Sequence, residues 1–183
     1  TIHGQGGTIS VQGVETIAFA SGETVVTDAR AGISLVGDNN TVTLGANARV
    51  SLAGHVNTVT DCNAGERVNL RSGDAIIQGS GGLVGIRGNG ISVAMSGQNV
   101  QVNDGVTFNL AGNGNAISMG AGGMMFLAAG TSNDVILNGQ SNRSVALGGF
   151  SLSGGNEVDL SGFLAGADLS NLGNYLHVDT VGN

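Results

Sequence analysis

The sequence predicts an all-β fold, a parallel β-solenoid in which short strands and glycine-rich turns repeat along one axis. The first observation is repetition: Thr41 to Gly54 reads TVTLGANARVSLAG, an apolar pair, a turn and a second apolar pair. The second is composition, because the 183 residues include 34 Gly and neither Pro nor Trp. The third is spacing: such rungs recur about every 8 to 9 residues, too short and too rich in glycine for helices.

Residues 1–31 are expected to form an N-terminal, strand-rich cap. Alternating apolar residues mark strands at Ile9 and Val11, at Ile17 and Phe19, and at Val25. Glycine turns separate these strands, as they do further along the chain, but the spacing between them is less regular. We therefore treat this segment apart from the repeats.

Residues 32–162 are predicted to form the solenoid itself. Each rung turns an apolar pair inward and the residue between outward, as with Ser51 between Val50 and Leu52. Two rungs return the chain to a new parallel layer, which predicts two strands and about 17 residues per coil. A β-helix with three strands and about 26 residues per coil is the alternative, and a glycine-rich antiparallel sandwich is the third. The rungs begin at Ile33, Val42, Val50, Val59, Val68, Ile76, Val84, Ile91, Val100, Phe108, Ile117, Met125, Val135 and Val145.

Asparagine recurs immediately before many rungs. Its amide can bond backbone groups of adjacent coils, and both Asn and Gly tolerate the positive φ that tight reversals need. We expect an asparagine ladder formed by Asn40, Asn57, Asn99, Asn115 and Asn133.

The pattern changes after the last rung, Gly154 to Gly162. Residues 163–183 are expected to form a C-terminal cap of short helical turns followed by a final strand from Tyr175 to Val181. That strand carries little charge, and an uncovered strand edge readily pairs with another chain. Head-to-tail self-association into a filament is one expectation, and a monomeric segment that is capped by further chain is the other.

Two short stretches resemble a known protein class. Gly13 to Ile17 (GVETI), continued by Phe19 and by Ser21-Gly22-Glu23, resembles a segment found beside the repeats of RTX, or hemolysin-type, secreted proteins. Asp159-Leu160-Ser161 and Asn174 to Val178 (NYLHV) are similar to the C-terminal region of bacterial adhesins that are secreted by a type I pathway. The resemblance implies degenerate RTX-like repeats, a location outside the cell or on the bacterial surface, and further chain after Asn183.

The resemblance to RTX proteins suggests calcium as a possible ligand of the turns. The family's calcium-binding repeat is G-G-x-G-x-D-x-U-x, and here its Asp position is mostly Asn, Gly or Ala. Neutral amides compensate poorly for the dehydration of Ca²⁺, so we expect no calcium array and assign no metal ligand. Asp104 and Asp134 are the best single candidates, although isolated turn aspartates usually cap backbone groups.

No catalytic or cofactor-binding residue is assigned. His3, His55 and His177 lie far apart in the chain, and Ser or Asp near each is expected by chance in so polar a sequence. Cys62 has no partner for a disulfide and no ligand cluster around it, so it is expected to be a small filler or a surface thiol.

Charge limits the partners. The 13 acidic residues against 6 Arg leave a formal charge of −7, and no basic run exists, which argues against nucleic acid and anionic membranes. No apolar run is long enough to insert into a membrane. Self-association and contact with a surface polysaccharide remain the expected partners.

Together these features predict a non-catalytic extracellular structural or adhesive module, part of a bacterial surface or biofilm matrix filament. A carbohydrate-active β-helix enzyme, or an accessory module of one, is the alternative. An ice-binding module is the second alternative, because Thr41-Val42-Thr43 and Thr58-Val59-Thr60 repeat the Thr-x-Thr pattern of ice-binding solenoids. Two such motifs are too few to predict a flat ice-matching face.

Overall fold

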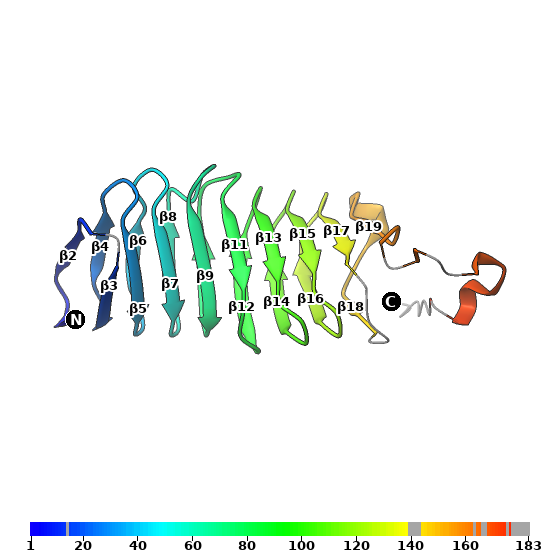
Figure 1. Ribbon diagram of the computed structural model, residues 1–183, viewed down its shortest axis with the longest axis horizontal. Coiled ribbons are helices and arrows are strands. Elements are labelled where there is room, and N and C mark those ends of the chain that lie inside the picture. Colours follow the sequence, from blue (N-terminus) through cyan, green and yellow to red (C-terminus); the bar gives the residue numbers. More distant parts are fainter. Residues whose placement is uncertain (14, 139–143, 163, 166–167, 175, 177–183) are drawn as a thin grey trace.

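The computed structural model shows a rod of stacked coils (Figure 1). The structure describes residues 1–13, 15–138, 144–162, 164–165, 168–174 and 176. The chain makes about 8 turns of about 17 residues, with two strands per turn and every strand parallel to its neighbours. The predicted two-strand solenoid is thus confirmed, and neither the three-strand helix nor the antiparallel sandwich is found.

Two sheets run the length of the rod, each taking alternate strands of the chain. Sheet A contains β1 (Ile2–Gln5), β3 (Thr16–Ser21), β5 (Gly32–Val36), β7 (Arg49–Ala53), β9 (Arg67–Ser72), β11 (Leu83–Ile86), β13 (Asn99–Val102), β15 (Ala116–Met119), β17 (Asp134–Leu137) and β19 (Glu157–Asp159). Sheet B contains β2 (Thr8–Val11), β4 (Thr24–Thr27), β6 (Thr41–Thr43), β8 (Asn57–Thr60), β10 (Asp74–Ile77), β12 (Ile91–Met95), β14 (Thr107–Ala111), β16 (Met124–Ala129) and β18 (Ala146–Gly148).

The core lies between the two sheets. Inward residues stack on residues of the same kind in the next coil, as Ile33 does on Val50 and Val50 on Val68. This stacking keeps the interior narrow and almost free of aromatic residues; Phe108 is the largest fully buried side chain among the described residues. Burial of these columns supplies the main favourable free energy of folding.

The strand β3, which the alternation of Ile17 and Phe19 marked in the sequence, turns these two residues outward. They are 49% and 46% exposed, and Ala18 and Ala20 are buried instead. Both faces of this strand are apolar, so alternation alone does not select one, and a shift of one residue exchanges them. Pairing decides the matter, because Ala18 lies beside the buried Leu35 of β5.

The rung assigned to Ile76 is wrong for the same reason. Ile76 is 48% exposed, whereas Ala75 and Ile77 on either side of it are buried. Ile77 lies beside Val59 and Met95, both of which point into the core. The three consecutive apolar residues left the inward position undetermined, and the neighbouring coils determine it.

The asparagine ladder exists, but as two separate ladders. Before the strands of sheet B, Glu23, Asn40 and Asn57 are buried in successive coils. Asn40 Nδ2 donates to Asn57 Oδ1 at 3.0 Å, and Asn57 Oδ1 also accepts the backbone N–H of Asn40. The Glu23 carboxylate ends this ladder by accepting the N–H of Gly7 at 2.7 Å.

The second ladder precedes the strands of sheet A. It is formed by Gln98, Asn115, Asn133 and Asn156, all buried. The expectation for Asn99 is wrong: its side chain is exposed and bonds only the carbonyl of Gly81 among the described residues, while Gln98 occupies the ladder position. Gln98 Nε2 donates to the carbonyls of Cys62 and Gly79.

The two segments expected to form caps differ in structure. Within residues 1–31, β1 to β4 pair in register with later strands and extend both sheets. After β17 the structure has two short 3₁₀ helices, η1 (Leu152–Gly154) and η2 (Leu169–Asn174), with β19 between them. Apart from Leu176, the expected strand from Tyr175 to Val181 lies outside the described residues. Among those described, no helix has the length and apolar character needed to cross a membrane.

Candidate functional site

The outer face of sheet B carries a column of threonines in its N-terminal half. Thr8, Thr24, Thr41 and Thr58 are register partners in four successive coils. We call these four residues the Thr column. Each points outward because the residue after it belongs to the buried core.

A second column runs beside the Thr column, two residues further along each strand. It contains Ser10, Val26, Thr43 and Thr60. Thr60 Oγ1 donates to Thr43 Oγ1 at 3.0 Å, so neighbouring hydroxyls in this column are linked to each other. The two Thr-x-Thr motifs seen in the sequence are therefore adjacent and in register, within a larger hydroxyl-bearing surface.

The same face becomes apolar towards the middle of the rod. Ile76, Ala94 and Ala111 continue the line of the Thr column through β10, β12 and β14. Together with Val56 and Phe126 they line a shallow groove of about 600 Å³. We call these five residues the apolar groove. Small alanines form its floor, and Phe126, 50% exposed, stands at one end.

Sequence reasoning missed this groove because it assigned Ile76 to the core. The alternation in Ile91 to Met95 could have revealed the groove. Ile91, Val93 and Met95 point inward there, and Ala94 points outward. Extending that register to β10 would have placed Ile76 outside as well.

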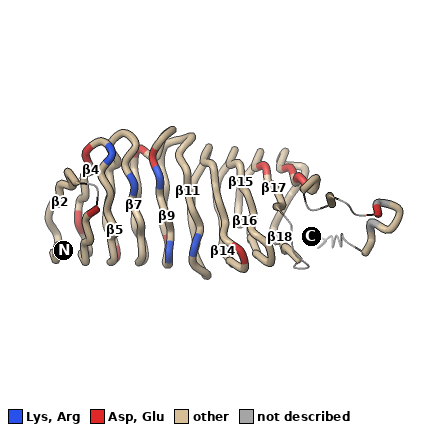
Figure 2. The backbone as a smooth tube through the Cα atoms, viewed as in Figure 1, with Lys and Arg blue, Asp and Glu red and all other residues tan. Residues whose placement is uncertain are grey.

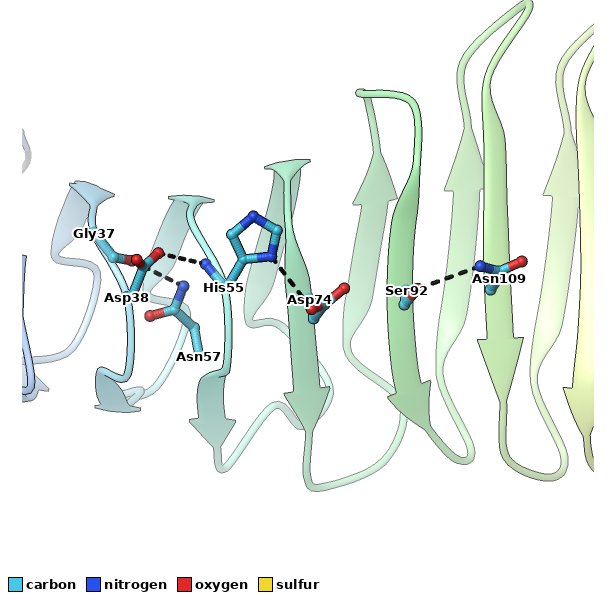
Figure 3. Close-up of polar contacts among 7 residues, drawn as sticks. All are labelled: Gly37, Asp38, His55, Asn57, Asp74, Ser92 and Asn109. Carbon is cyan, nitrogen blue, oxygen red and sulfur yellow. Dashed lines mark hydrogen bonds and ion pairs between the residues drawn. The ribbon is translucent and has the colours of Figure 1, made fainter.

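A line of polar residues borders the groove (Figure 3). His55 Nδ1 lies 3.3 Å from Asp74 Oδ2, and Asp38 Oδ1 accepts the backbone N–H of His55 at 2.6 Å. Further along, Asn109 Nδ2 donates to Ser92 Oγ at 3.3 Å. Register pairing places Asp74 beside Ser92.

This polar line does not form a nucleophilic triad. In a triad the histidine stands between the serine and the carboxylate, whereas here Asp74 lies between His55 and Ser92. The His55 and Asp74 side chains are also 66% and 49% exposed, so water surrounds the pair. The arrangement is suited to noncovalent contact along the rod.

The other candidate residues are dispersed. The ring of His3 stacks on Phe19 with centroids 5.4 Å apart, and His177 lies outside the described residues. Asp104 Oδ1 accepts the N–H of Ala121 at 2.9 Å, a backbone cap, and Asp134 is an exposed residue at the start of β17. No group of three His, Cys, Asp or Glu side chains that could hold a metal ion occurs in the described part of the chain.

Cys62 is fully buried beneath the turn that leads into β9. Desolvation by burial, followed by the nearby Glu66 carboxylate, raises the pKa of its thiol to about 12. Because the thiolate is the reactive form, this cysteine is an inert filler. Of the two roles expected for it, the structure supports the buried one.

Comparison of the chain with protein-family models, curated proteins and solved structures gives no match. Function is therefore inferred from the surface of the molecule. Sheet B offers two features for that inference, the Thr column and the apolar groove.

Proposed function

We propose that the protein is a non-catalytic structural or adhesive module of extracellular bacterial material, and that it associates with copies of itself through sheet B. The observation that carries this proposal is the outer face of sheet B. Among its described outward strand residues only Asp74 is charged, although the whole chain has a formal charge of −7. The resemblance to type I secreted adhesins supports a location outside the cell or at the bacterial surface.

The rod is suited to a structural role. Neighbouring coils are bonded through the two parallel sheets, and in the N-terminal and C-terminal parts of the rod also through buried side-chain amides. In such a stack each repeat contacts only its neighbours, so the rod lengthens without needing a larger core. A stiff rod with small outward residues presents long, regular surfaces for contact.

A second copy of this chain is the partner that the face fits best. Like-charged chains repel, and the neutral surface of sheet B is where two such chains can approach closely. The face carries projecting side chains and a hollow that can receive them. Phe126 and Met124 project from it, and the groove is shallow and lined by alanines. A two-fold arrangement would place Phe126 of each copy over the alanines of the other.

Sedimentation velocity over a range of concentrations, with electron microscopy of the same samples, tests this proposal. The wild-type protein should associate as its concentration rises, and Phe126→Asp should weaken that association. Phe19→Asp is the matched control, because Phe19 is similarly exposed but lies on sheet A. Monomers at every concentration, or equal effects of the two variants, would refute the proposal.

The enzymatic alternative has a direct test. Wild-type protein is incubated with a panel of polysaccharides, and released reducing ends are measured. Turnover that is lost in Asp74→Asn or His55→Ala would show that the polar line is catalytic, and the non-catalytic proposal would fail.

A second candidate function, ice binding, is favoured by the Thr column. Its threonines repeat about every 4.8 Å between coils and face the second column about 6.6 Å away along each strand. Flat, regular arrays of hydroxyl and methyl groups can order water as an ice surface does. Thermal hysteresis that is lost in Thr41→Tyr but kept in Thr107→Tyr would support it, and its absence from the wild type would exclude it.

A further inference from the structure

Arginine is gathered on one side of an otherwise acidic rod. The chain has 6 Lys and Arg residues in total, all arginine, and five of them lie in described segments. Figure 2 shows these five confined to consecutive coils, from the turn before β5 to the residue after β11. We call them the Arg patch: Arg30, Arg49, Arg67, Arg71 and Arg87.

The sequence suggested no basic patch, because these residues are separated in the chain. The register brings them together: Arg49 is the direct partner of Arg67 across β7 and β9. Arg71 and Arg87 each follow the paired residues Leu70 and Ile86, and Arg87 N–H donates to the Leu70 carbonyl at 2.9 Å. Arg49 and Arg67 form one pair of like charges, and Arg71 and Arg87 form another. Within each pair the two arginines lie on adjacent coils, whose backbones are about 4.8 Å apart.

Both pairs project from the same face. Along β9 the exposed Arg67 and Arg71 alternate with buried Val68 and Leu70, so both arginines point outward from sheet A. Four residues of a parallel strand separate them by about 13 Å. The two pairs therefore flank a strip of the outer surface of sheet A.

The charges in this patch lack partners. Like charges directly opposite on adjacent strands are destabilising. Within the described residues, the one ion pair joins His55 and Asp74 on the other sheet. The nearest carboxylate along β9, Glu66, is buried, and its oxygens accept backbone N–H groups of Asn47 and Asn63.

Polar groups lie between the two arginine pairs. Asn69 is paired with Ser51 on this strip, and its Oδ1 accepts a 2.8 Å hydrogen bond from Arg87 Nε. The Ser51 hydroxyl is covered, yet it has no hydrogen-bond partner. A covered polar atom without a partner costs free energy that a ligand reaching it would recover.

A hollow adjoins the patch at its N-terminal side. It measures about 460 Å³ and is lined by Arg30, Ala31, Gly32, Asn47 and Arg49. The backbone of Arg30 has φ of 64°, a conformation uncommon outside glycine and asparagine. The turn accordingly holds Arg30 at the hollow beside Arg49.

We propose that the Arg patch binds an acidic polysaccharide, a chain of sugars bearing carboxylate or sulfate groups. Guanidinium groups form bidentate hydrogen bonds with such anions, and paired arginines match repeated anionic groups. Asn69, between the pairs, meets the hydroxyls of the intervening sugars. The site goes beyond the structural role proposed above and does not depend on self-association.

Other polyanions fit this surface less well. Single-stranded nucleic acid is bound by stacking its bases on aromatic side chains, and the Arg patch contains none. Duplex DNA and anionic bilayers extend well past the four coils of the Arg patch, so they would meet the acidic remainder of a chain of charge −7. A flexible glycan can contact the patch and then leave the surface.

The test measures binding of wild-type protein to immobilised alginate and heparin, with neutral dextran as the negative control. Protein is kept at a concentration where sedimentation shows monomers, so that failure to bind and failure to assemble are distinguished. Arg49→Gln/Arg67→Gln lowers the net charge by two, as does the control Thr24→Glu/Thr107→Glu at exposed outward positions of sheet B, on the other face of the rod. Thermal melts of all proteins confirm folding.

The arginine variant should bind at least about tenfold more weakly, since two charge-assisted contacts are lost. The control should keep most of its affinity, and about 500 mM salt should weaken the wild type by screening. Because like-charge repulsion is relieved, the arginine variant should unfold at the same or a higher temperature than the wild type. No wild-type binding at about 50 mM salt, equal losses in both variants, or tighter binding to duplex DNA or anionic vesicles would each overturn the proposal.

Discussion

Asn115 lies beside Asn133 of the next coil, and its Nδ2 atom donates a 2.9 Å hydrogen bond to Oδ1 of Asn133. The same oxygen accepts the backbone N–H of Asn115 at 3.0 Å. Asn115 Nδ2 also donates to the carbonyl of Met95, 20 residues earlier. One buried side chain therefore connects the coil before it to the coil after it.

Replacing this side chain should destabilise the rod. Asn115→Ala leaves the carbonyl of Met95 and the backbone N–H of Gln98 without their side-chain partner, so the free energy of unfolding should fall by about 1–3 kcal/mol. Urea denaturation followed by circular dichroism measures it. Asn99→Ala, at the exposed neighbouring-coil asparagine, should change stability by less than about 0.5 kcal/mol. Similar losses in both variants would contradict the two-ladder arrangement.

The orientation of β10 can be tested at two adjacent isoleucines. Ile77→Ala removes a buried side chain and should cost about 2–5 kcal/mol of unfolding free energy. Ile76→Ala, on the outer face, should cost less than about 0.5 kcal/mol. Urea melts of the two variants compare them directly, and the reverse order would show that the strand faces the other way.

Glycine is required where coils approach each other most closely. At Gly112, φ is 133°, and a Cβ atom would overlap the carbonyl oxygen of Met95. Gly112→Ala should therefore destabilise the protein by more than about 1 kcal/mol, because both the conformation and the space exclude a side chain. At Gly13 an added Cβ would meet nothing within 4 Å. Thermal melts should show a clear loss for Gly112→Ala and little change for Gly13→Ala.

The buried thiol of Cys62 should resist alkylation. Its pKa is raised to about 12, first by desolvation and then by Glu66, so little thiolate forms in the folded protein at pH 8. Iodoacetamide labelling read by mass spectrometry should be slow in buffer and fast in urea. Equal labelling rates in the two conditions would mean that the site opens readily.

The same shift predicts how stability depends on pH. The ordinary thiol pKa of 9.0 applies to the unfolded chain, and the folded value is higher. This contribution to stability is therefore complete below about pH 9 and is lost as pH rises towards about 12, because the unfolded thiol ionises first. Urea denaturation at pH 7 and pH 10 measures the free energy of unfolding. Between these two pH values it should decrease more for the wild type than for Cys62→Ala.

Folding should be insensitive to calcium. The turn positions carry amides and glycines, and Asp104 caps the backbone of Ala121. Circular dichroism and melting temperature should be the same with excess calcium and with excess chelator. Loss of the β signal on chelation would show that turn carbonyls hold metal without a carboxylate array.

Much of this molecule was determined by the sequence itself. The period of the rungs, the coil of about 17 residues and most inward positions follow from alternation and turn residues, which are local properties. Asn40, Asn57, Asn115 and Asn133 were placed correctly in a ladder, and each lies two residues before the first buried apolar residue of a rung. Local patterns suffice wherever one face of a strand is clearly more apolar than the other.

Only the tertiary structure decided the rest. In β3 both faces are apolar and in β10 three apolar residues are consecutive, and pairing with neighbouring coils turned Phe19 and Ile76 outward. Arg49 and Arg67 are 18 residues apart, and they meet because the turns between them bring β7 and β9 into that register. The residues that stand in one column on the surface depend on the lengths of all the turns between them. Adding or removing one residue in a turn would change the strand register and move an arginine out of the column. The faces that this protein presents to its partners are therefore set by register, which local alternation does not encode.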